Sequence, residues 1–411
     1  MADTNAPSPS ALLLGLGGCL DYEMAWDAEI FSALVREYGI APAEIDAGSV
    51  IESERALVCS ILAFMRDGDG GERVVADHAV IETFSARFSR RVALGGTSVR
   101  AGIAMSKIGL ASTLHLVSID DQVRALLPDG IDYVCSAGAD SINPHLIVQY
   151  PRGASVAVGD DTVVAPHPNR LIYVSDPPNR EMVLAEDLGD ALAKARLFLI
   201  SGFNAMVDRE ALEVRMSQLR AAMNRLSRDA LVVFEDAGYH VPSFNRVVID
   251  ALLYRIDVYG MNEDELQSHI GRRINLLDPV DVAQALREVA ARVPAPILVV
   301  HTKYWALAYG EHARSMRDKL EGGVAMASAR FLYGDALDAD RHASIAGVPS
   351  QAAGRDFAAR IEAALGGEVC CVPGRELDTE TPTTIGLGDA FVGGIVAALA
   401  RRADAATPAA P

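Results

Sequence analysis

A short segment near the C-terminus combines residues that suit the transfer of a charged group. The run Thr384–Asp389 (TIGLGD) places two glycines and an aspartate directly before a stretch of small apolar residues that predicts a helix. Backbone N–H groups at a helix start bind anions, so Gly386, Leu387 and Gly388 are predicted to cradle a phosphoryl group. The adjacent carboxylate of Asp389 is placed to take a proton from a hydroxyl. An aspartate that merely caps a helix is the competing interpretation.

Acidic and amide side chains follow two of the predicted strands. Glu235 closes the apolar run 230–235, and Asn262 and Glu265 come shortly after the run 255–259. Because the carboxyl ends of parallel strands meet at one edge of a sheet, we expect these side chains to lie near one another. Their oxygens suit Mg²⁺ or another divalent cation, directly or through water. For Asn262 and Glu265, a helix cap with acids in its first turn explains the pattern equally well.

Polar and aromatic residues also follow the apolar run 297–301. His301, Thr302 and Tyr304 lie where α/β proteins bind ligands, and they suit a nucleotide base or phosphate. Spacing alone favours an ordinary solvated loop at this point.

Glycines mark two turns at which the backbone can approach a ligand closely. The segment Gly15–Asp21 lacks the third glycine of a dinucleotide-binding fingerprint, because Leu20 occupies that position. We therefore reject a Rossmann-type site and predict that Asp21 contacts the substrate. Gly95 and Gly96 form a second such turn before a helical pattern, with a simple loop hinge as the alternative.

The candidate residues are distributed along a regular alternation of elements. Short apolar runs, typical of strands buried on both faces, alternate with amphipathic runs typical of helices. This alternation predicts an α/β fold with a mostly parallel sheet and helices on both of its faces. The predicted strands are residues 11–17, 112–116, 197–201, 230–235, 255–259, 297–301 and 369–372. The predicted helices are residues 98–108, 208–226, 263–273, 280–292 and 354–365.

Two segments interrupt the alternation. A turn-rich Asp-Gly run opens the first, and short β-like pieces separated by Gly, Pro and Asn fill the second. They predict inserted strands that form a small β-rich lid. The predicted organisation is a core of residues 11–66, 95–131 and 175–400, a lid of residues 67–94 and 132–174, and disordered tails at residues 1–10 and 401–411.

The composition excludes several classes of protein. A formal net charge of −18 argues against binding to nucleic acid or to an anionic membrane surface. No apolar stretch approaches the roughly 20 residues that span a bilayer, and the N-terminus does not resemble a signal peptide. Five scattered cysteines without a CxxC pair argue against a disulfide framework or a zinc site and favour a reducing cytoplasm. The oligomeric state cannot be read from these patterns.

Taken in order, the segments resemble the ADP-dependent glucokinase and phosphofructokinase family of the ribokinase-like superfamily, over roughly residues 11–399. Thr384–Asp389 is similar to the family's TVGLGD signature, and Asn262 and Glu265 match the superfamily's NxxE motif. Gly15–Gly17 with Asp21 resembles the family's opening strand and its sugar-contacting aspartate, and Gly95 with Gly96 resembles the paired glycines that face the sugar. His301–Tyr304 resembles a family run near the nucleotide, and Asn169–Ile172 resembles a run of the Asn-Arg-Phe-Ile type.

The resemblance implies a ribokinase-like three-layer α/β/α core with a small β-rich lid. It implies a kinase in which ADP, with Mg²⁺, phosphorylates a hexose or a hexose phosphate of the glucose or fructose 6-phosphate type and leaves AMP. Asp389 would be the base, with the Gly386–Gly388 amides stabilising charge. The metal would be held by Glu235, Glu265 and Asn262, the sugar by Asp21, Gly95 and Gly96, and the nucleotide by Arg170, His301, Thr302 and Tyr304.

Three positions depart from the family pattern. Val233 stands where a histidine is usual, Cys19 replaces an asparagine, and Thr97 replaces an asparagine or glutamine. Since two of the three lie on the sugar side, the acceptor is less determined than the reaction. Two alternatives stay open: an ATP-dependent ribokinase-like kinase of another alcohol or a nucleoside, and a catalytically silent nucleotide or sugar sensor. The retained Asp389 argues against a sensor, which needs no base.

Overall fold

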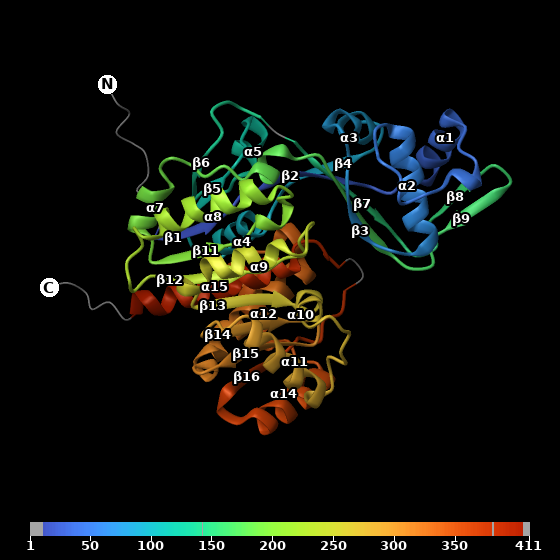
Figure 1. The fold of residues 1–411 in the computed structure, drawn as a ribbon. Coiled ribbons are helices and arrows are strands. Elements are labelled where there is room, and N and C mark those ends of the chain that lie inside the picture. The colour runs from blue at the N-terminus through green and yellow to red at the C-terminus, as the bar shows by residue number, and fades with distance from the viewer. Residues whose placement is uncertain (1–10, 142, 380–381, 406–411) are drawn as a thin grey trace.

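The computed structural model describes residues 11–141, 143–379 and 382–405, and it is built on two main sheets (Figure 1). In the larger sheet β15 runs antiparallel to both neighbours, whereas the other paired strands are parallel. The predicted mostly parallel sheet is therefore confirmed. In spatial order its strands are β16 (Val369–Pro373), β15 (Trp305–Gly310), β14 (Ile297–His301), β13 (Val258–Asn262), β12 (Leu231–Glu235), β11 (Leu197–Ile200), β1 (Leu12–Gly15), β5 (Ser112–Leu116) and β6 (Ile131–Cys135).

Helices cover both faces of this sheet, so the core has the predicted three layers. Neighbouring side chains of β1 show the division, since Leu12 and Leu14 belong to one buried cluster and Leu13 to the other. The first face carries α4 (Thr97–Ser106), α12 (Arg317–Tyr333) and α15 (Leu387–Ala405). The second carries α7 (Leu188–Lys194), α8 (Arg209–Met223), α9 (Phe244–Leu252), α10 (Glu263–Ile270), α11 (Pro279–Arg292) and α14 (Ala352–Leu365). Shorter helices are α5 (Asp121–Leu126), α6 (Pro177–Glu181) and α13 (Ala339–Ser344).

Glycines bring three helices of the first face into backbone contact. A side chain at Gly394 of α15 would overlap the Gly322 carbonyl of α12, and one at Gly393 would press on the Ala101 carbonyl of α4. The small-residue helix predicted after Asp389 therefore packs unusually closely on both neighbours.

The second sheet and its helices form the lid, drawn in blue and green beside the core in Figure 1. Its helices bury Phe31, Phe84 and Phe88 in a cluster with aromatic residues of the sheet. The sheet order is β3 (Gly71–Val74), β10 (Asn169–Val174), β7 (His145–Tyr150), β2 (Cys19–Met24) and β4 (Arg90–Gly95). The helices are α1 (Ala28–Tyr38), α2 (Glu54–Asp67) and α3 (His78–Ser85), and β8 (Ser155–Val158) pairs with β9 (Asp161–Val164).

The lid is larger than the sequence indicates. β2 follows β1 after three residues, yet it pairs with β4 and β7 in the lid, and α1 and α2 belong there too. Conversely, β6 pairs with β5 in the core. The periodicity of a strand shows which faces are buried but not which sheet it joins, which explains both differences. The predicted inserted strands of residues 67–94 include a helix, α3.

The ends of the chain differ partly from the prediction. α15 continues to Ala405, past the predicted start of the tail at residue 401. The remaining predicted tail residues, 1–10 and 406–411, lie outside the described residues.

Candidate active site

The predicted base stands in the first turn of α15. Gly386 has a φ of 73°, in the left-handed region that favours glycine, and α15 begins at the next residue. The side chain of Asp389 is 24% exposed and faces a cavity between core and lid. The glycine turn is thus found where it was predicted, but the helix begins two residues before Asp389 and not after it, so Asp389 lies inside the first turn and is not the cap.

Two cavities meet at this turn. The lid-side cavity, of about 290 Å³, contains Gly386 and Asp389 in its wall. The core-side cavity, of about 670 Å³, contains Leu387 and Gly388. Two molecules bound in these cavities would face each other across one loop, with backbone N–H groups and a carboxylate between them.

Each cavity gathers a different set of predicted residues. The lid-side cavity is lined from the lid by Cys19, Asp21, Glu72, His145 and Arg170, and from the core by Gly96, Thr97, Arg100 and Asn179. The core-side cavity is lined by Asn262, Glu263, Asp264, His301, Thr302, Lys303, Tyr304, Gln351, Arg375 and Phe391. The structure therefore does not bring Arg170 together with His301, Thr302 and Tyr304.

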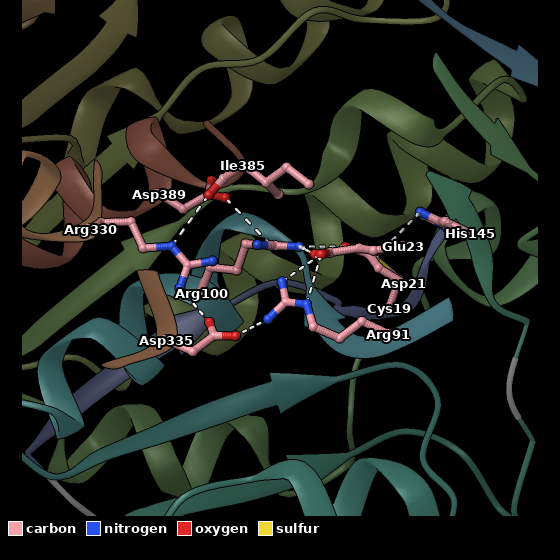
Figure 2. Close-up of polar contacts among 10 residues, drawn as sticks. All are labelled: Cys19, Asp21, Glu23, Arg91, Arg100, His145, Arg330, Asp335, Ile385 and Asp389. Atoms are coloured by element: carbon pink, nitrogen blue, oxygen red, sulfur yellow. Dashed lines mark hydrogen bonds and ion pairs between the residues drawn. The ribbon is translucent and has the colours of Figure 1, made fainter. Parts of the chain in front are cut away.

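Arg100 of α4 links two of the carboxylates that line the lid-side cavity, Asp21 and Asp389 (Figure 2). Its Nη2 donates to Asp21 Oδ2 at 2.6 Å, and its Nε lies 3.9 Å from Asp389 Oδ2. Glu23 adds a third carboxylate at 3.6 Å. Burial works against the charged guanidinium, but the negative charges of Asp21 and Asp389 raise the pKa of Arg100 above its usual range. Arg100 is therefore a fixed positive charge that holds the predicted substrate contact and the predicted base in one frame.

The same network continues to the outer side of the core, where it ties the lid to α12 (Figure 2). Arg91 of β4 donates to Glu23 at 3.0 Å and also contacts Asp335. Asp335 accepts at 2.6 Å from Arg330 of α12. Arg100, Arg91 and Arg330 thus connect four acidic side chains in one network across the junction of the lid and the core. These are Asp389, Asp21, Glu23 and the exposed Asp335.

The predicted metal ligand Glu235 lies at the end of β12, beside β13. A side chain at Gly260 of β13 would overlap the Glu235 carboxylate, so the glycine lets this carboxylate cross the strand. Glu235 Oε1 then lies 2.9 Å from His301 Nε2 on β14. His301 in turn packs its ring against Phe391 of α15, with centroids 4.6 Å apart. The histidine that contacts Glu235 therefore comes from β14, two strands away, whereas Val233 is buried in the core.

Asn262 and Glu265 form a capping box at the start of α10. The Asn262 side chain accepts from the N–H groups of Asp264 and Glu265, and Glu265 accepts from Asn262 N at 2.6 Å. The helix-cap interpretation is thus realised. Burial, together with the charges of Glu235 and Asp236, raises the pKa of Glu265 to about 9. Burial also raises the pKa of Glu235. Glu235 is buried and Glu265 partly buried, and the two interacting carboxylates form a donor set whose charge a divalent cation would offset.

Thr302 has a local structural role in the turn between β14 and β15. Its hydroxyl accepts from Tyr304 N and Trp305 N and lies 3.0 Å from the Trp305 carbonyl oxygen. Tyr304 has Lys303 Nζ 4.9 Å from the centre of its ring. The turn is thus ordered by its own side chains while it forms one wall of the core-side cavity.

Gly95 and Gly96 serve different purposes. A side chain at Gly95 would overlap both the Asp21 carboxylate and the Cys19 sulfur, so Gly95 makes room for these two side chains. Gly96 lines the lid-side cavity. Cys19 donates to Asp21 Oδ1 at 3.3 Å, and burial, together with the charge of Asp21, raises the pKa of its thiol to about 12.

Sequence reasoning missed Arg100 and His145. Arg100 is the single charged residue of α4, one turn after Gly96, and a lone charge in an otherwise apolar or small helix was the available signal. His145 opens β7, a lid strand whose position beside β2 gives it access to Asp21. No local sequence pattern predicts that β7 pairs with β2.

The comparisons with known proteins agree with this geometry. Residues 10–321 match the conserved region of ADP-specific phosphofructokinase/glucokinase. A hypothetical ADP-dependent phosphofructokinase from Pyrococcus horikoshii OT3 has a similar structure, with a TM-score of 0.79 at 17% identity over 97% of this chain and 99% of that chain. The last common ancestor of ADP-dependent phosphofructokinases from Methanosarcinales gives 0.76 at 14% identity, over 95% and 93%. No curated protein sequence matches this chain significantly.

The chain therefore belongs to the ADP-specific phosphofructokinase/glucokinase family, as the sequence resemblance implied. It is a phosphotransferase that acts on a hydroxyl, an ADP-dependent sugar kinase by family. A third similar structure is an ADP-dependent kinase complex with fructose-6-phosphate and ADPbetaS, with a TM-score of 0.71 at 13% identity over 95% of this chain and 94% of that chain. Among the described residues, no helix is both long and apolar enough to cross a membrane.

Proposed function

We propose that this protein transfers the terminal phosphoryl group of ADP to a hydroxyl of a hexose phosphate of the fructose 6-phosphate type, with Asp389 as the base. One observation carries the proposal: the Gly386–Asp389 turn divides the lid-side cavity from the core-side cavity and offers its carboxylate to the first and Gly388 to the second. The sugar would occupy the lid-side cavity and the nucleotide the core-side cavity.

In this arrangement each residue has a distinct task. Asp389 takes the proton of the attacking hydroxyl, and Asp21 holds a second hydroxyl of the sugar. Arg100 fixes both carboxylates, so they are oriented before the sugar arrives. The Gly386–Gly388 N–H groups stabilise the charge on the phosphoryl oxygens. Thr302 and Tyr304 line the wall beside the nucleotide, and His301 positions Glu235. The lid excludes water, which would otherwise act as acceptor.

Mg²⁺ fits the chemistry of the residues at the ends of β12 and β13. Glu235 and Glu265, with Asn262 beside them, would hold it directly or through bridging waters. Bound there, the ion would neutralise negative charge on the phosphates.

Arg170 favours a phosphorylated acceptor over glucose. It is exposed on β10 and lines the lid-side cavity opposite the core. Glu72, an acid close enough to interact with it, is also in contact with His240 Nε2 at 2.7 Å. We therefore propose that Arg170 binds the phosphate of the sugar rather than the nucleotide.

The test is a kinetic screen of the purified protein with Mg²⁺, in which ADP and ATP are each paired with fructose 6-phosphate and with glucose. We expect the highest kcat/KM with ADP and fructose 6-phosphate. Arg170→Ala should lower kcat/KM for fructose 6-phosphate by at least about tenfold, the effect of one lost charge-assisted contact. Turnover with ATP but not with ADP would support the ATP-dependent kinase instead. A ligand-dependent shift in the melting temperature, with no release of AMP or ADP, would support the silent sensor. A soluble location in the cytoplasm is part of this proposal.

A further inference from the structure

Three ligand-type side chains meet on the wall of the lid-side cavity. Among the residues that the structure describes, Cys19, Asp21 and His145 are the group whose metal-ligand atoms all lie within 4.8 Å of one another. The Cys19 sulfur is 3.3 Å from Asp21 Oδ1, and His145 Nδ1 is 3.8 Å from the same oxygen. Ligands of a tetrahedral Zn²⁺ ion stand about 3.4–3.6 Å apart, given bond lengths of about 2.0–2.3 Å. Two of the three separations are therefore close to those around a tetrahedral ion, and the third, between Cys19 and His145, is at most 4.8 Å.

The outer contacts of the cluster orient its ligands. His145 Nε2 lies 2.9 Å from Asp176 Oδ2, which leaves Nδ1 directed at Asp21 and Cys19. Asn179 fixes Asp176 by donating to the same oxygen at 2.6 Å. Arg100 binds Asp21 Oδ2, so that Oδ1 faces the other two ligands (Figure 2). In protein metal sites, the ring nitrogen of a ligating histidine that does not bind the metal usually donates to a carboxylate, a carbonyl oxygen or water.

We infer that Cys19, Asp21 and His145 bind a thiophilic divalent cation of the Zn²⁺ class, which competes with the acceptor sugar. The thiol of Cys19 releases its proton to solvent as the sulfur binds the ion, and Asp21 supplies the second negative charge, so the two anions balance the ion. The fourth position opens into the lid-side cavity, which all three residues line. The number and spacing of the cysteines argue against a zinc site, but these ligands come from two neighbouring lid strands, Cys19 and Asp21 from β2 and His145 from β7.

The inhibitory consequence rests on the proposed function, because it requires Asp21 to hold the sugar. The metal site itself does not depend on the proposed function. Mg²⁺ is a hard cation that prefers oxygen ligands, so the cluster would discriminate against the ion proposed for the phosphates.

The first test uses Co²⁺ as a spectroscopic probe and needs no kinase activity. Titration of the full chain with Co²⁺ in excess Mg²⁺ should give a thiolate-to-cobalt charge-transfer absorption at one equivalent. Cys19→Ser should abolish it, whereas Cys135→Ser, a cysteine outside the cluster, should retain it. His145→Gln should lower the Co²⁺ affinity by at least about tenfold. Thermal melting of each variant separates loss of a ligand from loss of the fold. A charge-transfer absorption that persists in Cys19→Ser, or none in the native chain, overturns the site.

The second test concerns inhibition. At fixed ADP, Zn²⁺ should raise the KM for the acceptor without lowering kcat, and a chelator should reverse the effect. Cys19→Ser should weaken this inhibition at least about tenfold, and Cys135→Ser should match the native chain. Zn²⁺ inhibition that competes with ADP instead would place the ion elsewhere. If no acceptor is phosphorylated at all, the proposed function fails, while the cobalt spectrum still decides the metal site.

Discussion

The lid-side and core-side cavities share one loop but are built in different ways. The lid-side cavity is walled by the lid sheet on one side and by loops and helix starts of the core on the other, and its central residues are charged side chains that hold one another, namely Asp21, Arg100 and Asp389. The core-side cavity is walled by core elements, and its polar residues are organised by helix capping and turn contacts. We infer that the lid-side cavity determines which acceptor reacts, whereas the core-side cavity provides a preformed site for the nucleotide.

The strongest way to separate the two cavities is Asp389→Asn. It removes the base while keeping the side-chain volume, so kcat should fall by about 10²–10⁴-fold. Because Asp389 faces the lid-side cavity, the affinity for ADP should stay within about twofold. Single-turnover kinetics and calorimetric ADP titration measure the two effects. A kcat loss below about tenfold would show that Asp389 is not the base.

Arg100→Ala should have the next largest effect. Removing the guanidinium frees Asp21 and Asp389 from their shared position, and misplacement of this kind costs about a hundredfold in kcat/KM for the acceptor. ADP affinity should not change. Arg100→Lys, which keeps the charge but loses the planar fork, should retain part of the activity. Lys107→Ala, at the C-terminal end of the same helix, is the matched control. Equal losses for the acceptor and for ADP would contradict the division between the cavities.

The smallest effect is expected from Glu265→Gln and concerns stability. The folded-state pKa of Glu265 is raised from 4.5 to about 9, so the native chain holds a proton that the unfolded chain releases. This contribution to the free energy of unfolding is present at low pH and is lost as the pH rises from about 4.5 to about 9. Without divalent cations, the variant should therefore melt a few degrees higher than the native chain at pH 8 and equally at pH 5.

Two further measurements check this expectation. Adding Mg²⁺ should narrow the difference at pH 8, because the cation offsets the buried charge of the native carboxylate. Glu210→Gln, which changes an exposed acid in the first turn of α8, should leave the pH dependence of melting unchanged. The same pH slope for the native chain and for Glu265→Gln would argue against the raised pKa.

The sequence predicted the core-side cavity better than the lid-side cavity, and topology explains why. Asn262, Glu265 and His301 follow parallel strands, and the carboxyl ends of such strands must meet at one edge. The lid strands follow no comparable rule. The contact of Asp21 with His145, and of both with Cys19, depends on β2 leaving the core to pair with β4 and β7. Arg100 was visible in the sequence, but its two carboxylate partners were not. The roles assigned to these side chains remain predictions until the variants are measured.

The close packing of α15 would hold the proposed base, Asp389, in one position. With Gly393 against α4 and Gly394 against α12, α15 cannot shift without displacing both neighbours. We therefore expect Asp389 to keep its position, and any closure of the site to move the lid and the sugar bound to it. Acceptor choice can then drift through changes in the lid strands while the chemical step is preserved. Directed evolution toward a new sugar should accordingly yield substitutions in β2, β7 and β10 and leave α15 intact.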